Sequence, residues 1–321
     1  NNLYPLFKHH DRSQFEIFAY SQQEITDDFT DWFKKKADHW REIQHLSDTE
    51  QVAEIRSDKI DILVDCSGHT AGNRLRALSY RPAPIQVSAF GFVFTTGTKA
   101  IDYQFSDAFA TPPGRASLFT ERLIHLPSQI HWKPLTEEIR DLPISSSPSL
   151  NNGYITFGSG NGSFKHNEYV VKIWAAILKQ VPNSQLHLKS ARFGDLSVQS
   201  MFRKSFQKLG IGPERISFKG TTPAVEHLQF YNTIDIALDP FPYTGGMTTC
   251  DVIYMGVPLI ALDGDGIRTS VSLLSLVGVP ELIAKTPEEY VFKAVALAKN
   301  PQRLTQYRQQ LRSGMQQSPI M

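Results

Sequence analysis

Glycine and threonine residues stand between a strand-like apolar run and a short helical pattern in the stretch 238–258. These residues are Gly245, Gly246, Thr248 and Thr249. Such a loop opens backbone N–H groups toward the start of the helix, where the helix dipole favours a negative group. A phosphate or diphosphate is therefore the natural ligand. The spacing Thr248-x-x-Asp251 also resembles a capping box, so a purely structural role for these two side chains stays open.

A lysine and a histidine follow two other predicted strands. Lys165 stands in a glycine-containing loop after the apolar run 154–158, and His69 stands in a small-residue loop after the run 60–65. A lysine at a strand end can place a positive charge on a diphosphate and stabilise it as a leaving group. A histidine titrates near neutral pH and can serve as an acid or a base. The alternatives are a solvated lysine and a histidine that is hydrogen-bonded to the backbone.

Strands and helices alternate along the whole sequence, which predicts an α/β fold with parallel sheets. The alternation is interrupted once, over a polar stretch rich in serine and proline. We therefore predict two Rossmann-like domains facing a cleft, over residues 1–135 and 153–321, with a linker over 136–152. In such sheets, ligands bind at the carboxyl ends of the strands.

Hydrophobic spacing predicts the individual elements. A polar, aromatic-bearing helix is expected over 27–41, and the last two helices, over 287–299 and 301–311, are expected on the surface. The predicted strands cover 15–20, 60–65, 84–90, 103–106, 122–126, 154–158, 184–189, 215–218, 234–239 and 257–262. The other predicted helices cover 49–57, 168–180, 198–209, 224–231, 250–255 and 271–276, and a further one ends near Leu78.

Composition excludes several classes of protein. The net charge is +1, which gives no electrostatic reason to expect binding to nucleic acid or to an anionic membrane surface. No apolar run approaches the roughly 20 residues that span a bilayer. Cys66 and Cys250 form neither a disulfide framework nor a metal cluster, which fits a reducing, cytoplasmic compartment. We expect no metal and no cofactor, and we interpret the acidic pair Asp263 and Asp265 as part of a turn.

Three separated blocks of the sequence resemble the catalytic region of the O-linked N-acetylglucosamine transferases, most closely the bacterial and SPINDLY-type branch. The blocks are LDPFPYTGGMTTCDVIYMGVPLIAL, ILVDCSGHTAGNRLRALSYRPAPIQVSAFGF with TTGTKAIDY, and ITFGSGNGSFKHNEYVVKIWAAILKQVPNSQLHLK. They occur in the family's order and cover nearly the whole chain. The resemblance implies GT-B architecture and sugar transfer to Ser or Thr hydroxyls of intracellular proteins. Helical TPR repeats usually precede this region, and the abrupt ends of the chain lead us to expect a fragment.

The resemblance assigns roles to individual positions. Lys165 matches a lysine that contacts the nucleotide diphosphate, Thr248 matches a threonine at the phosphate, and Asp251 matches an acid that binds the ribose hydroxyls. His227 matches a histidine that lies against the base in animal enzymes, although a partly buried helix histidine is the ordinary alternative. Arg268 matches a family arginine that could face the donor or brace its loop.

The sequence also departs from the family pattern. Gly246 stands where some relatives carry a histidine, Met247 stands where they carry a threonine, and Phe230 replaces a basic residue of the animal enzymes. Backbone donors and Thr249 are therefore expected to hold the diphosphate, while His69 is expected at the active site. The remaining expected contacts to the nucleotide-sugar are Thr222, Gly245, Thr95, Thr96 and Gly97.

The combined prediction is a metal-independent, inverting glycosyltransferase that moves N-acetylglucosamine from UDP-N-acetylglucosamine to Ser or Thr of proteins. Asp251 favours this donor over GDP-fucose, the alternative within the same family. A non-catalytic nucleotide-sugar-binding scaffold is the rival of another class: Gly246 favours it, whereas Lys165 and Asp251 oppose it. A dehydrogenase is disfavoured because no G-x-G-x-x-G motif with a downstream acid follows a strand.

Overall fold

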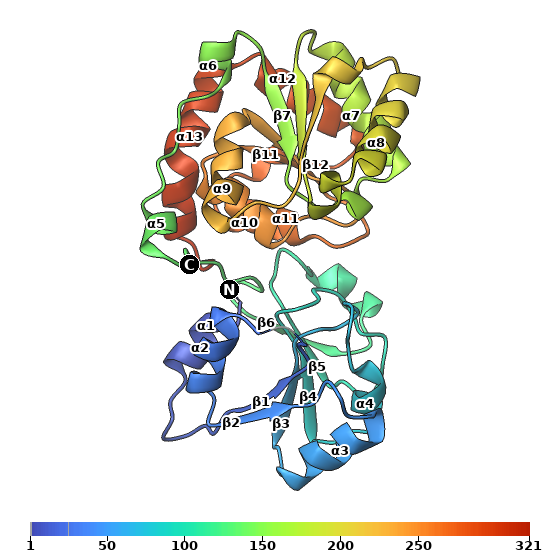
Figure 1. Cartoon of the computed structure of the whole chain (residues 1–321), viewed down its shortest axis with the longest axis vertical. Coiled ribbons are helices and arrows are strands. Elements are labelled where there is room, and N and C mark those ends of the chain that lie inside the picture. Colours follow the sequence, from blue (N-terminus) through green and yellow to red (C-terminus); the bar gives the residue numbers. More distant parts are fainter. Residues whose placement is uncertain (1, 25) are drawn as a thin grey trace. The chain divides into compact units, whose positions relative to one another are not determined.

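The protein consists of two compact units, over residues 1–131 and 132–321. This is seen in a computed structural model that describes residues 2–24 and 26–321 (Figure 1). Each unit is an α/β layered structure built on parallel strands, as the alternating pattern predicts.

Unit 1 contains two parallel sheets (Figure 1). The first has β1 (Phe18–Ser21) and β2 (His39–Glu42), and the second has the order β3 (Ile62–Asp65), β4 (Ile85–Ser88), β5 (Tyr103–Ser106) and β6 (Arg122–His125). Its helices are α1 (Tyr4–His9), α2 (Asp28–Lys36), α3 (Asp48–Ser57) and α4 (Leu75–Ser79). A buried cluster of Ile55, Leu63, Leu78, Ala83 and Ile101 joins the helices to the sheet.

The predicted helix over 27–41 was wrong in its second half. The helix begins at a capping box, in which Asp27 accepts from the Thr30 backbone, and it ends at Lys36. Ala37 is extended, with ψ 147°, and His39 already belongs to β2. Lys34, Lys35 and Lys36 lie in the last turn, where positive charges interact favourably with the helix dipole. Their position is therefore typical of the end of a helix. Helical spacing alone did not reveal the strand that follows.

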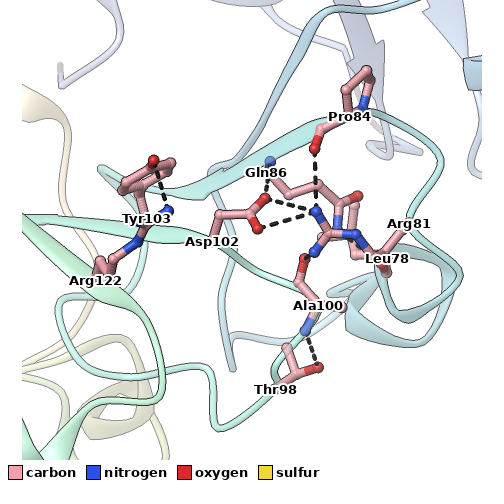
Figure 2. A network of polar contacts seen from close by, with 9 residues as sticks. All are labelled: Leu78, Arg81, Pro84, Gln86, Thr98, Ala100, Asp102, Tyr103 and Arg122. Atoms are coloured by element: carbon pink, nitrogen blue, oxygen red, sulfur yellow. Dashed lines mark hydrogen bonds and ion pairs between the residues drawn. The ribbon is translucent and has the colours of Figure 1, made fainter.

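A polar network fixes the start of β4 and β5 (Figure 2). The Arg81 guanidinium donates to both Asp102 carboxylate oxygens at 3.0 Å and to the Ala100 carbonyl at 2.7 Å. Gln86, which is fully buried, donates from its side chain to the carbonyls of Ala100 and Leu78. Figure 2 shows these groups converging on the segment before β5. The network lies at the amino ends of the strands, so its role is structural.

Unit 2 contains a six-stranded sheet in which all neighbouring strands are parallel, with the strand order β12-β11-β10-β7-β8-β9. If β7 is counted as the first strand of the sheet, the order from the β9 edge to the β12 edge is 3-2-1-4-5-6. This is the strand order of a doubly wound nucleotide-binding sheet. Its switch point, where the strand order reverses, lies between β7 and β10. The strands are β7 (Thr156–Ser159), β8 (Gln185–Lys189), β9 (Ile216–Lys219), β10 (Ile236–Leu238), β11 (Leu259–Leu262) and β12 (Ile283–Ala284).

Helices flank the sheet of unit 2 (Figure 1). They are α7 (Glu168–Gln180), α8 (Leu196–Lys208), α9 (Ala224–Gln229), α10 (Met247–Tyr254), α11 (Thr269–Leu276), α12 (Pro287–Ala298) and α13 (Pro301–Gln316). The bounds predicted for α7 are confirmed, and Trp174 on its inner face is completely buried. The prediction that α12 and α13 are surface helices holds only for their outer faces, because Tyr290 and Leu311 are buried in the core.

The polar stretch over 136–152 belongs to unit 2, although the sequence suggested a linker there. It forms α5 (Glu137–Arg140) and α6 (Ser149–Asn152), and it buries Ile139 and Leu142. The buried Asp235 carboxylate accepts hydrogen bonds from the Ser147 hydroxyl and from the Ser149 backbone at 3.0 Å. Polar residues form the hydrogen bonds to this buried carboxylate. The pattern of hydrophobic residues therefore does not show that the stretch is packed against unit 2.

In the described part of the chain, no helix is long and apolar enough to cross a membrane.

Candidate functional site

The loop that follows β7 carries Lys165 to the switch point of unit 2. Ser163–Lys165 form one 3-10 turn, after which the Asn167 side chain caps α7. The Lys165 ammonium donates to the Thr244 carbonyl at 2.8 Å and to the Asn161 side chain at 3.2 Å. It also lies 4.3 Å from the centre of the Tyr243 ring. Lys165 therefore joins the loop after β7 to the loop after β10, where a doubly wound sheet binds its ligands.

The loop after β10 leads directly into α10, and crowding requires glycine at position 245. A Cβ atom on Gly245 would lie 2.4 Å from the Thr249 hydroxyl and 3.0 Å from an Asp239 oxygen. Gly246 occupies the N-cap position of α10 and is half-buried. The first backbone N–H groups of a helix have no partner within the helix, and the dipole makes them an anion site. Thr248 is half-buried in this first turn.

Thr249 has a packing role in this conformation. Its side chain is completely buried, and its hydroxyl lies 2.9 Å from the Ser270 hydroxyl of α11. Ser270 in turn donates to the Gly245 carbonyl at 3.1 Å. The predicted contact of Thr249 with phosphate stays a prediction, while the observed contacts tie the glycine loop to α11.

Asp239 lies beneath this loop and was not predicted. It follows β10 directly, is fully buried, and accepts from the Gly245 backbone N–H at 2.9 Å. Burial raises the pKa of the Asp239 carboxyl to about 6, although the Ser270 hydroxyl, the Gly245 amide and the charge of Lys165 act against that rise. For Lys165, burial lowers the pKa of the ammonium, and the charge of Asp239 opposes this effect. The charges of the two groups therefore influence each other at the switch point.

A second group of side chains lies around Asp251, about one turn further along α10. His227 Nε2 is 3.3 Å from Asp251 Oδ2, and His227 Nδ1 is 3.0 Å from the Lys189 ammonium. The indole N–H of Trp132 donates to Asp251 Oδ1 at 2.8 Å. Asp251 and His227, predicted separately, are thus brought together. Trp132 and Lys189 were missed because they lie far away in the sequence, although Lys189 ends a predicted strand.

Two further predicted residues lie around this region. Arg268 is half-buried at the N-cap of α11, and its guanidinium forms an ion pair with Asp263 at 3.2 Å. This contact supports the bracing role that the sequence left open. Thr222 precedes α9 and is half-buried, with its hydroxyl oxygen shielded from solvent. Its contact with the donor remains a prediction.

His69 lies in unit 1, in the turn that follows β3. The buried Asp65 carboxylate accepts from the backbone N–H groups of Ser67 and Gly68 and so fixes this turn. Gly68 has φ +52°, and a Cβ there would lie 2.2 Å from Phe92 Cβ, so only glycine fits. The His69 ring is exposed and meets the Phe92 ring edge-on at 5.3 Å. A histidine is thus presented at a strand end, as predicted.

The loop over 95–97 is held by Glu121, immediately before β6. Thr95 Oγ1 donates to one Glu121 oxygen at 2.7 Å, and the Thr96 backbone N–H donates to the other at 2.7 Å. The Thr96 hydroxyl also donates to Glu121, and Gly97 N–H donates to Thr95 Oγ1 at 3.0 Å. Both threonine hydroxyls are therefore engaged at the amino end of β6. The expected contact with the transferred sugar stays a prediction.

Within the described residues, no group of three or more His, Cys, Asp or Glu side chains is arranged to hold a metal ion.

Comparison with known proteins identifies the family. The chain matches Glycosyl transferase family 41 over residues 3–133 and 136–321. The chain belongs to this family. A Solanum lycopersicum protein named as a probable UDP-N-acetylglucosamine–peptide N-acetylglucosaminyltransferase SPINDLY is 38% identical over 97% of this chain. The match covers 34% of that relative, so this family 41 chain spans about a third of its length.

Solved structures place the family 41 chain in a fold class. A lysine-to-methionine mutant of the Thermobaculum terrenum O-GlcNAc transferase is 34% identical, with a TM-score of 0.89 over 98% of this chain and 60% of that one. Anabaena HepE, solved with UDP and glucose, has a TM-score of 0.55 over 94% of this chain and 88% of that one, at 13% identity. The fold is therefore that of the GT-B glycosyltransferases, which confirms the predicted fold class.

Proposed function

We propose that this family 41 chain carries a nucleotide-sugar site that transfers N-acetylglucosamine from UDP-N-acetylglucosamine to Ser or Thr hydroxyls of proteins. One observation carries the proposal: Lys165 is held at the switch point against the loop that starts α10. A positive charge and the first amides of a helix together form a site for a diphosphate. The names of the relatives supply the sugar, the nucleotide and the peptide acceptor.

The chemistry that suits this site is inverting displacement. The acceptor oxygen attacks the anomeric carbon, and the bond from that carbon to the diphosphate oxygen breaks on the opposite side. Negative charge grows on the departing diphosphate, and Lys165 together with the amides of α10 would stabilise it. Asp251, about one turn further along α10, and the adjacent His227 would meet the ribose and the base. The acceptor proton leaves to a base that we do not assign.

Unit 1 would serve the acceptor through His69. Its exposed ring at a strand end suits a group that meets a substrate rather than one that supports the fold. We place the reaction in the cytoplasm. We also propose that it needs neither metal nor cofactor, because Lys165 supplies the positive charge that a metal ion would otherwise bring to the diphosphate. Full activity in excess chelator is the expected result, and loss of activity that is restored by magnesium would contradict it.

Nucleotide binding provides the first test. Titration calorimetry with UDP, GDP and ADP should show selective binding of UDP to the wild-type chain. Selective binding of GDP would instead indicate a GDP-fucose donor, the alternative within the family. Failure to bind any nucleoside diphosphate selectively would remove the enzymatic proposal.

Donor hydrolysis tests the role of Lys165. A Lys165→Ala variant should lose about 100-fold in the rate of UDP-N-acetylglucosamine hydrolysis, since removal of one group that stabilises developing charge typically costs 10²–10³ in rate. Lys172→Ala is the matched control, because Lys172 is exposed on α7 in the same unit. Equal hydrolysis by the Lys165→Ala variant and the wild type would exclude this lysine from the mechanism.

A further inference from the structure

A buried carboxylate lies directly beneath the proposed diphosphate site. Asp239 has no exposed surface, and its backbone is fixed on both sides: its N–H donates to the Ile260 carbonyl at 3.0 Å, and its carbonyl accepts from the Tyr290 hydroxyl at 3.0 Å. Its side chain accepts from Gly245 N–H, in the loop that begins α10. The carboxylate therefore cannot swing away when an anion approaches that loop.

The neighbours of Asp239 come from several elements. The loop after β7 contributes the Lys165 ammonium and the Asn161 side chain, and α12 contributes the Tyr290 phenol. The helices α10 and α11 contribute the neutral hydroxyls of Thr249 and Ser270. Lys165 is thus the cation that faces this carboxylate, and Tyr290 is the other titratable group beside it.

A diphosphate would change this balance of charge. In the free protein, the charge of Lys165 favours the ionised form of Asp239, but that form is already costly because the group is buried. A bound diphosphate brings two further negative charges to the same lysine and the same glycine loop. Like charges a few ångströms apart in a site sheltered from water repel strongly, so one of them is better neutralised.

We propose that Asp239 takes up a proton when the diphosphate of the donor binds, and that this proton removes the negative charge that would otherwise repel the donor and partly offset the charge of Lys165. The proposal rests on the proposed function, because it assigns the diphosphate to this site. The proton comes from the solvent and adds to a carboxylate oxygen of Asp239, while Lys165 keeps its own protons. The same proton returns to the solvent when the diphosphate leaves.

Burial already raises the pKa of Asp239 to about 6 in the free protein, which sets the direction of the effect. If donor binding adds a proton to Asp239, the affinity for the donor rises as the pH falls. The rise occurs between the pKa of Asp239 in the donor-bound protein and its pKa in the free protein. The expected interval begins near pH 6 and extends above pH 7. UDP-N-acetylglucosamine is the correct probe, because its diphosphate is a diester and lacks the second phosphate ionisation near pH 6 that UDP has.

Calorimetry can count the proton directly. Binding of UDP-N-acetylglucosamine to the wild-type chain at pH 7 should give enthalpies that differ between buffers of low and high ionisation enthalpy, with uptake of up to one proton. Affinity should be about tenfold higher at pH 6 than at pH 8. Binding without proton uptake, or an affinity that is flat with pH, would overturn the inference and leave the proposed function intact. No binding at any pH would overturn both.

The Asp239→Asn variant separates this role from a merely structural one. Asparagine keeps an oxygen for the Gly245 N–H and imitates the protonated acid, so the variant should bind at pH 8 about tenfold more tightly than the wild type, without proton uptake. A structural role predicts weaker binding at every pH. If proton uptake persists in Asp239→Asn and disappears in His227→Gln, the proton belongs to the histidine and the inference is wrong. If Asp239→Asn does not fold, the wild-type proton count decides.

Discussion

Glu121 shows how a single carboxylate can organise a loop that the sequence associated with the substrate. It accepts from the Thr96 backbone, from the Thr96 hydroxyl and from the Thr95 hydroxyl. Burial acts to raise the pKa of Glu121, but the hydrogen bonds from Thr96 and Thr95 outweigh it and lower the pKa below its ordinary value. The ionised form is therefore favoured by the folded state and stabilises it.

Removal of this carboxylate should loosen the loop. Glu121→Ala leaves the buried Thr96 N–H without its acceptor, and we expect a loss of about 2 kcal/mol in the free energy of unfolding in urea at pH 7. The contribution is present above the unfolded pKa of glutamate, roughly 4.3, and is lost as the pH falls through the lower folded pKa. The difference between variant and wild type should therefore shrink below pH 4. Glu138→Ala, at an exposed glutamate, is the control; an equal loss there would contradict the assignment.

Short motifs in the sequence single out residues that the structure places close together, although their roles stay predictions. Lys165 and the glycine pair before α10 follow from local spacing, and the structure brings Asp251 and His227 within 3.3 Å of each other. Trp132 was not found, since its contact with Asp251 spans 119 positions. Asp239 could have been found, because an acid at the end of a buried strand is where this sheet class places functional groups.

At the scale of elements, the helix α13 anchors the start of unit 2. The buried Arg308 donates to the carbonyl of Ser145 at 3.3 Å and to the carbonyl of Ile234. Burial lowers the pKa of Arg308 to about 10, and the charge of Asp235 opposes this change. This cation and the buried apolar side chains Leu304, Leu311 and Met315 hold a helix with a mostly polar sequence against the sheet. Hydrophobic spacing alone predicted a surface helix.

Loss of the Arg308 charge should destabilise unit 2. Arg308→Met keeps much of the side-chain volume but removes the donors to the buried Ile234 carbonyl and the half-buried Ser145 carbonyl, together with the charge that faces Asp235. We expect a loss of about 3 kcal/mol, because breaking a buried charged network leaves its partners uncompensated. Urea denaturation followed by tryptophan fluorescence would measure it. Arg303→Ala on the same helix removes a solvent-accessible ion pair with Glu281, a hydrogen bond to Gln306 and a cation–π contact with the Tyr307 ring. It should cost about 1 kcal/mol, so a similar loss for both variants would refute this role.

At the scale of the whole molecule, the division into two units was predictable, but the position of the boundary was not. The structure divides the chain between residues 131 and 132, and the sequence suggested a linker that ends at 152. Backbone and side-chain groups of residues 132–152 form hydrogen bonds with buried residues far along the chain. Trp132 N–H donates to the Ile320 carbonyl at 2.9 Å, and the Ser147 hydroxyl donates to the Asp235 carboxylate. Such long-range hydrogen bonds leave no periodic signal in the sequence.

Two fragments test which boundary is functional. Residues 132–321 contain Lys165, Asp251 and the helix α10, so this fragment should fold and bind UDP within about threefold of the whole chain. A fragment over 153–321 lacks the indole that donates to Asp251 and two of the donors to the buried Asp235, the Ser147 hydroxyl and the Ser149 backbone N–H. The loss of each such group costs about 1–3 kcal/mol. It should be less stable and should bind UDP at least tenfold more weakly. Circular dichroism on heating and calorimetry would compare the two, and equal stability and affinity would show that the stretch 132–152 is a linker after all.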